Sequence, residues 1–267
     1  MNANFLTILF CLTLIMGLIS LVDIIFWRPK RRAMGDKKYP KVVEYSRSFF
    51  PVLLIVLVIR SFIGQLFDVP SGSLEPTIMP KAFILVNQFS YGLRLPVWEK
   101  KIIPIGEPKR GDIVLFHSPV RPNFDLIKRV VGVPGDRISY INKVLYINGK
   151  AAKQKFIRYT TDTDENHPGI NWTVKVMQED LLGVKHNIYV CPSSSTECPN
   201  PNIHNFYNLV VPKGEYFMMG DNRDDSDDGR FWGFVPEGNI MGQGWRVIFS
   251  WNRQNNSIRW NQVWKKL

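Results

Sequence analysis

A short stretch between two prolines holds the first side chains that could do chemistry. It reads Pro70-Ser71-Gly72-Ser73-Leu74-Glu75-Pro76. Such a stretch predicts a rigid, exposed turn that displays a hydroxyl group and leaves backbone N–H groups free to bind an oxyanion. On spacing alone, an ordinary surface loop is the simpler interpretation, because the same residue types are common in loops. A nucleophile here would also need a base.

Histidine is not the expected base. The four histidines lie in polar, loop-like contexts where a solvent-facing or satisfied structural role is the default; they are His117, His167, His186 and His204. A Ser-His-Asp triad stays open but has no support in the sequence. The chain also lacks the Gly-x-Ser-x-Gly, His-Glu-x-x-His, Ser-x-x-Lys and Walker motifs. Several common hydrolase and nucleotide-binding designs are therefore disfavoured.

A second candidate segment contains a lysine where an apolar residue is expected. Lys128 interrupts the apolar run from Leu126 to Val133. Side chains of a strand alternate between two faces, so Lys128 and Arg129 point in opposite directions and one cation must face apolar company. The alternative interpretation is an edge strand whose charges oppose aggregation.

A third candidate segment, from Gly220 to Gly233, is dense in aspartate and arginine. Part of it, Asp224-x-Ser226-x-Asp228-Gly229, imitates the start of a calcium loop. The twelfth position, however, is Val235 where a bidentate glutamate is needed, so calcium is not expected. The composition instead predicts internal ion pairs that hold a serine in a defined place.

Together these segments resemble the conserved boxes of type I signal peptidases, the bacterial membrane proteases that remove signal peptides from exported proteins. The matching motifs are Pro-Ser-Gly-Ser-x-x-Pro-Thr, Lys-Arg-Gly-Asp-Ile-Val, Ile-Lys-Arg-Val-Val-Gly-x-Pro-Gly-Asp and Gly-Asp-Asn-Arg-Asp-x-Ser-x-Asp-x-Arg-x-Trp-Gly, in the family order. Residues from about 150 to 210 have no recognisable match. The resemblance implies a serine endopeptidase that needs no metal or cofactor, with Ser73 as nucleophile and Lys128 as general base of a Ser/Lys dyad.

The resemblance also implies supporting roles for other residues. The Ser71 hydroxyl and the Ser73 N–H would form the oxyanion hole, and Ser226 would orient Lys128. Structural support would come from Asp228, Arg223 and Arg230. An ordinary lysine, with a pKa of about 10.4, is a poor base near neutral pH, so this mechanism requires that burial lowers the pKa of Lys128.

Substrates are expected as extended segments with small side chains at the first and third positions before the cut. Shallow pockets for them would be lined by Val69, Leu74 and Ile127. The chain departs from the family pattern at Leu74, where methionine is usual, and at Gly229, where serine is frequent. Leucine keeps the volume and apolarity of methionine, whereas Gly229 leaves the supporting network less well defined.

Two apolar segments predict a membrane protein. Phe5 to Val22 is uncharged, which predicts a transmembrane helix within residues 1–27. A cleaved secretory signal is disfavoured, because no basic residue precedes the run and no Ala-x-Ala site follows it. A weaker second span is predicted at residues 48–67, interrupted by Arg60, with a buried helix as the alternative. Residues 28–47 carry a net charge of +6, which places them in the cytoplasm and residues 68–267 in the periplasm.

The external region, residues 68–267, predicts a mainly β, antiparallel-sheet domain of the signal peptidase type. Short runs of β-branched and aromatic residues alternate with turn signals, among them the hairpin signal Asn148-Gly149. Residues 151–210 are more polar and are interpreted as an insertion or smaller subdomain. Within them, Cys191 and Cys198 could form a disulfide in an oxidising compartment, and zinc is a poor alternative because no histidine has the spacing of a metal ligand.

The expected partners are signal peptides of secreted preproteins, membrane lipid and, further, the protein export machinery. The net charge of +11 is spread too widely for a nucleic-acid face. The expected location is the bacterial inner membrane, in a multi-pass arrangement. Two alternatives are a soluble self-cleaving repressor of the LexA type, which the membrane segments disfavour, and a membrane-tethered β-rich binding module in which Ser73 and Lys128 are incidental.

Overall fold

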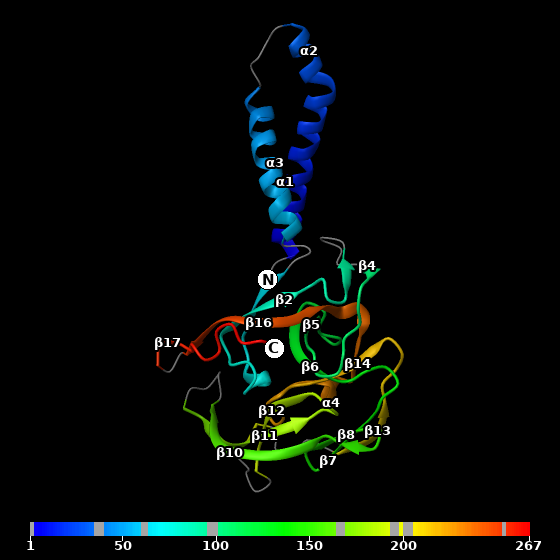
Figure 1. Cartoon of the computed structure of the whole chain (residues 1–267), viewed down its shortest axis with the longest axis vertical. Coiled ribbons are helices and arrows are strands. Elements are labelled where there is room, and N and C mark those ends of the chain that lie inside the picture. Colours follow the sequence, from blue (N-terminus) through cyan, green and yellow to red (C-terminus); the bar gives the residue numbers. More distant parts are fainter. Residues whose placement is uncertain are drawn as a thin grey trace. The chain divides into compact units, whose positions relative to one another are not determined.

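The computed structural model describes most of the chain as two compact units. The first comprises Met1–Gln65 with Gly92–Ile105, and the second Leu66–Tyr91 with Gly106–Leu267. Both are drawn in Figure 1. The residues that the structure describes are 3–34, 40–59, 64–94, 101–163, 169–192, 198–199, 205–252 and 255–267.

A long helix dominates the first unit. Helix α1 (Ala3–Val22) continues through the π-helical turn η1 (Asp23–Trp27) into α2 (Arg28–Ala33). Within it, Phe5–Arg31 is long and apolar enough to cross a membrane, with a mean hydropathy of 2.7. The first predicted span therefore lies on a helix, which extends beyond its predicted end at residue 27.

Of the two predicted membrane helices, one is found among the described residues, where Phe5–Arg31 meets the length and hydropathy of a span. Helix α3 (Lys41–Val58) starts before the predicted second span and carries Lys41, Glu44 and Arg47 in its first turns. At the other end, Gln65–Val69 forms strand β1, with Val69 buried, instead of a membrane helix. Arg60 lies outside the described residues.

The predicted basic loop, residues 28–47, is also helical at both ends, in α2 and in the start of α3. Residues 35–39 of it lie outside the described residues. The fully buried Asp23 carboxylate forms an ion pair with Arg31 and lies 3.8 Å from a guanidinium nitrogen of Arg47 on α3. Helices α1 and α3 meet closely at Gly17, where a Cβ would lie 2.7 Å from the ring of Phe50. The hairpin of β3 (Gly92–Arg94) and β4 (Lys101–Pro104) completes the unit.

The main sheet of the second unit has eight strands among the described residues. Its order is β1-β2-β16-β5-β6-β14-β15, and β17 (Ser257–Ile258) pairs with β16. The remaining bounds are β2 (Ala82–Asn87), β5 (Ile113–His117), β6 (Asp125–Gly132), β14 (Glu215–Met219), β15 (Phe234–Pro236) and β16 (Ile240–Asn252). Strand β6 pairs with β5 and β14, so the interpretation of the Lys128 segment as an edge strand is wrong.

Two smaller sheets accompany it. One has the order β13-β7-β8-β9 and the other β10-β11-β12. The bounds are β7 (Arg137–Ile141), β8 (Val144–Ile147), β9 (Lys150–Ala151), β10 (Lys153–Thr163), β11 (Asn171–Asp180), β12 (Lys185–Val190) and β13 (Phe206–Val210). The predicted turn Asn148-Gly149 joins β8 to β9 with positive φ at both residues, 51° and 77°. The polar region 151–210 is thus mostly strand where it is described.

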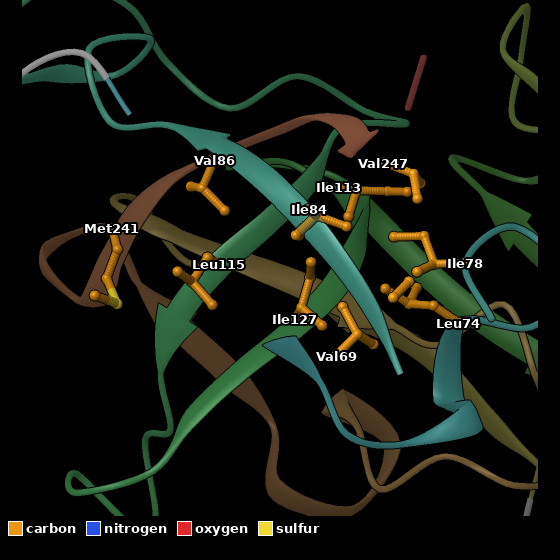
Figure 2. Packing of buried hydrophobic residues seen from close by; sticks show 11 residues of the cluster. Val69, Leu74, Ile78, Ile84, Val86, Ile113, Leu115, Ile127, Met241 and Val247 are labelled. Carbon is orange, nitrogen blue, oxygen red and sulfur yellow. The ribbon is translucent and has the colours of Figure 1, made fainter. Parts of the chain in front are cut away.

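Apolar side chains from β1, β2, β5, β6 and β16 pack together over one part of the main sheet (Figure 2). The cluster includes Val69, Leu74 and Ile127, and all three are buried. A second cluster packs on the other face of β6 and includes Val114 and Val130, with Leu126 against it. The period of two therefore operates along β6 as predicted, with Lys128 on the face of Leu126 and Val130.

Candidate active site

Ser73 lies in a single turn of 3₁₀ helix, η3 (Gly72–Leu74), directly after the extended Ser71. Backbone hydrogen bonds from Glu75 N to Gly72 O and from Thr77 N to Leu74 O, both 2.9 Å, hold the turn. The prediction of an exposed turn is wrong, since Ser73 has only 6% of its surface accessible. It is covered because residue 222 of the acidic segment donates a backbone hydrogen bond of 3.1 Å to the Ser73 carbonyl.

The structure brings Lys128 directly to Ser73. The Lys128 Nζ donates a hydrogen bond to Ser73 Oγ, across 55 positions of sequence. The Ser71 hydroxyl donates a longer hydrogen bond, 3.4 Å, to the same Ser73 oxygen. Lys128 itself is 4% exposed. The hydroxyl groups of Ser71 and Ser73 and the amine of Lys128 therefore meet at one largely buried point.

Burial lowers the pKa of Lys128 from 10.5 to about 8, because the charged ammonium loses its water. Nearby carboxylates, chiefly Asp228 and Asp227, oppose this change, and the Arg230 guanidinium assists it. With a pKa of about 8, roughly one lysine in five is neutral at pH 7.4, compared with about one in a thousand at the ordinary value. The amine can therefore accept a proton from Ser73 near neutral pH.

Gly220 is the point at which the acidic segment approaches the nucleophile. A Cβ at Gly220 would lie 2.5 Å from the Ser73 carbonyl oxygen and would collide with the Ser226 hydroxyl. Ser226 is thus packed beside the Ser73 turn and is 2% exposed. Its hydroxyl has no hydrogen-bond partner among the described residues, so the structure places Ser226 near the site without a bond to Lys128.

Asp228 and Arg230 form a buried ion pair behind the site. Arg230 donates from Nε at 2.8 Å and from a terminal nitrogen at 2.7 Å to the two carboxylate oxygens of Asp228. Asp228 also caps helix α4 (Gly229–Trp232) and accepts a 2.9 Å bond from Gly220 N. Burial alone would raise the pKa of Asp228, but the Arg230 guanidinium holds it below its usual range. The Asp228–Arg230 pair therefore holds Gly220 in place through the bond from Gly220 N. The family resemblance predicts such a structural role for both residues.

Arg223 does not join that pair, contrary to its predicted grouping. Its guanidinium forms a two-point ion pair with the fully buried Glu179 of β11, one contact being 2.9 Å. Its Nε donates at 3.2 Å to the Gly220 carbonyl. Arg223 therefore connects Gly220 to strand β11 of the smaller β10–β12 sheet.

A third buried ion pair, between Arg129 and Asp221, was missed from the sequence. Arg129 Nε donates to Asp221 at 2.7 Å, and a terminal nitrogen donates to the other oxygen at 2.6 Å. Burial alone would raise the pKa of Asp221, but the Arg129 guanidinium holds it below its usual range. A partial signal existed, because alternation along β6 places Arg129 on the face opposite Lys128, and an arginine that is buried there needs a carboxylate partner.

His186 is buried between two of these carboxylates and not solvent-facing. Its Nε2 lies 3.5 Å from Glu179 and 3.6 Å from Asp221, and burial lowers its pKa to about 4. His117 is half-buried, with Nδ1 2.8 Å from Asp125, and His167 and His204 lie outside the described residues. Neither described histidine is bonded to Ser73.

Cys191 and Cys198 form a disulfide. No group of His, Cys, Asp or Glu able to hold a metal occurs among the described residues. Val69, Leu74 and Ile127, predicted to line substrate pockets, meet in the core cluster beneath the Ser73 turn (Figure 2). Strand β1, which carries Val69, lies at the edge of the main sheet and leads into Ser71 and Ser73.

A buried serine bonded to a buried lysine on a mainly antiparallel β scaffold is an arrangement suited to a serine peptidase. Residues 42–249 match the family model described as signal peptidase, peptidase S26. The chain is 40% identical over 279 residues to signal peptidase I of Pseudomonas aeruginosa, covering 94% of each chain. It is 32% identical over 255 residues to signal peptidase I of Haemophilus influenzae, covering 80% of this chain and 71% of that one.

The chain is therefore a serine peptidase, and it belongs to the signal peptidase family, peptidase S26. A further relative, signal peptidase I of Aquifex aeolicus, is 35% identical over 225 residues, covering 75% of this chain and 82% of that one. The apolar helix Phe5–Arg31 agrees with a membrane-anchored member of the family.

Proposed function

We propose that this chain is a membrane-bound endopeptidase that cleaves N-terminal signal peptides from exported preproteins by a Ser/Lys dyad. The observation that carries the proposal is the hydrogen bond between Lys128 Nζ and Ser73 Oγ, two side chains that are both largely buried. The substrate class is that named by the relatives, each a signal peptidase I.

The reaction begins with neutral Lys128. It accepts the Ser73 hydroxyl proton while Ser73 Oγ attacks the scissile carbonyl, and the carbonyl oxygen becomes an oxyanion held by the Ser71 hydroxyl and the Ser73 N–H. Collapse of this intermediate breaks the C–N bond, and Lys128 returns the proton to the leaving amine. An acyl-enzyme on Ser73 remains. Water then attacks with the same lysine as base, releasing the carboxylate and regenerating the serine.

The edge strand β1 is the element best suited to receive an extended substrate. It lies at one end of the main sheet, and its last residue, Val69, is two positions before Ser71. A peptide that adds to such an edge gains main-chain hydrogen bonds and places alternate side chains into pockets. Cleavage after small residues would follow if Val69, Leu74 and Ile127 form the floor of those pockets.

The proposed location is the bacterial cytoplasmic membrane, with the catalytic unit on the periplasmic side. Basic residues between the ends of α1 and α3 favour the cytoplasmic face for that end of the helical unit. Helix α3 returns the chain alongside α1 (Figure 1), and this orientation requires that α3 crosses the membrane as well. Added protease should digest the catalytic unit in spheroplasts but not in intact cells, and protection in spheroplasts would contradict this orientation.

The decisive experiment compares Ser73→Ala and Lys128→Ala with the wild type, in detergent, on a purified preprotein. Both variants should lose cleavage while remaining folded, and an acylating probe should label wild type at Ser73. Retained cleavage by the Lys128 variant would overturn the dyad. A binding module, in contrast, would give neither cleavage nor an adduct.

A further inference from the structure

Residues 221–224, here called the clamp segment, lie between the Ser73 turn and the smaller β10–β12 sheet. On one side, Asn222 N donates to the Ser73 carbonyl at 3.1 Å, and Asp221 receives the Arg129 guanidinium. Gly220, just before the segment, lies so close to Ser73 that a Cβ there would be 2.5 Å from the Ser73 carbonyl oxygen, and Ser226 follows just after the segment. Any displacement of the segment would therefore displace the surroundings of both Ser73 and Lys128.

The other side of the clamp segment is bonded to strand β12. Tyr189 N donates to Asp221 O, and Arg223 N donates to Tyr189 O, each at 2.9 Å. These two bonds make a parallel bridge between Tyr189 and Asn222. The Asn222 side chain adds a 2.7 Å hydrogen bond to Asp162 of β10. The clamp segment thus pairs with β12 at the edge of the β10–β12 sheet through one isolated β-bridge.

Asp224 closes this attachment with both carboxylate oxygens. Oδ2 accepts a 2.7 Å hydrogen bond from Cys191 N, just past the end of β12. Oδ1 lies 3.0 Å from Lys143 Nζ, in the turn between β7 and β8. Lys143 also donates to the Cys191 carbonyl at 3.3 Å, and the disulfide to Cys198 restrains Cys191 further. The Asp224 side chain is 1% exposed, so water cannot replace either partner.

We propose that Asp224 is a positioning residue for the reaction, which holds the clamp segment against β12 so that Ser226 and the Ser73 carbonyl stay packed around Gly220. The proposal rests on the Ser/Lys function proposed above. It also gives the polar region 151–210 a role as the outer support of the catalytic centre. A carboxylate is needed because its negative charge pairs with the Lys143 ammonium while its other oxygen accepts the hydrogen bond from Cys191 N, and an amide supplies no charge.

The test measures cleavage of a preprotein by full-length Asp224→Asn in detergent, over a range of pH. We expect kcat to fall about 10-fold with KM within about two-fold, since the edge that receives substrate is not touched. The acidic limb of the kcat profile should also move to higher pH, because a loosened loop admits water to Lys128 and raises its pKa toward the ordinary value. Lys143→Met should shift both quantities in the same direction, by less.

Glu215→Gln is the matched control, because it removes a charge of the same sign from β14, outside the clamp segment. It should leave kcat and the pH profile unchanged. Labelling of Ser73 by an acylating probe counts competent sites in each sample and so removes any effect of partial unfolding. If Asp224→Asn does not fold, Lys143→Met decides the matter by the same two readouts.

The outcomes separate this inference from the proposed function. Cleavage by Ser73→Ala, or no labelling of wild-type Ser73, would defeat the proposed function itself. Wild-type labelling together with an unchanged kcat and pH limb in Asp224→Asn would overturn the role of Asp224 alone. A rise in KM with unchanged kcat would also overturn it, because it would place Asp224 in substrate binding.

Discussion

Two neighbouring residues of β6, Lys128 and Arg129, are both buried cations, but their surroundings on the two faces of the strand give them different roles. Lys128 faces Ser73 and apolar side chains, and burial lowers its pKa to about 8. Arg129, on the other face, is equally buried but meets both oxygens of Asp221. A buried lysine without a bonded carboxylate loses its proton more readily, whereas a buried arginine that meets one forms a structural ion pair. One face of β6 therefore carries the proposed general base, Lys128, and the other carries a structural ion pair through the next residue, Arg129.

The largest effect is expected from Lys128→Arg, which keeps the positive charge and removes the ability to deprotonate. Cleavage of a preprotein at pH 8 should fall by at least about 1,000-fold, because general-base assistance is lost. Initial rates with active-site counting would measure it, with Ser73→Ala as the inactive reference. Activity above about a tenth of wild type would show that charge, not proton transfer, is what the position supplies.

The same substitution by methionine should change stability in opposite directions on the two faces. Arg129→Met leaves Asp221 buried without its partner and should destabilise the protein by about 3 to 5 kcal/mol. Lys128→Met removes an ammonium whose burial costs up to about 3 kcal/mol near neutral pH, and should stabilise the inactive protein by about 1 to 3 kcal/mol.

Thermal and denaturant unfolding of the full chain in detergent would measure both changes. The gain from Lys128→Met should shrink as pH rises from about 8 to 10.5, because in that window the unfolded chain still binds the lysine proton and the folded wild type does not. Destabilisation by both variants would contradict the proposed difference between the faces.

A pH profile sharpens the assignment of the base. Because only neutral Lys128 accepts a proton, kcat/KM should rise with pH through an apparent pKa near 8. Between pH 6 and pH 8 the rise should be roughly 50-fold for a single ionisation. A limb near pH 6.5 that disappears in a His117→Ala variant would instead indicate imidazole catalysis.

The smallest effect is expected from Leu74→Met, which restores the residue usual in the family. The side chain is fully buried in the core cluster, and the exchange conserves volume, so stability should change by less than about 1.5 kcal/mol. Cleavage rates should stay within about three-fold. Leu74→Phe is the matched overpacking variant and should cost about 1 to 3 kcal/mol. A large loss with methionine would show that pocket shape is set more tightly than volume alone requires.

The sequence predicted the face of Lys128 because alternation along a strand is a local property, read from residues 126 to 133. It predicted the chemistry of Ser73 and Lys128 only through the family resemblance, since no spacing rule joins positions 55 residues apart. The partner of Arg223 could not be predicted, because Glu179 lies on a strand in a region where the sequence shows no recognisable family motif. The end of the predicted second span was placed too late, because Gln65–Val69 pairs as an edge strand of the main sheet, and no local pattern in the sequence distinguishes that strand from the end of an apolar helix.

The absence of a side chain at Gly220 limits how the thermal stability of this enzyme can be increased. Replacing loop glycines with alanine is a common way to reduce the freedom of an unfolded chain. At this position the new methyl group would act as a wedge between the Ser73 carbonyl and the Ser226 hydroxyl. An alanine at this position would therefore have to push Ser73 and Ser226 apart. Any gain in thermal stability from the substitution would come with a loss of catalytic activity.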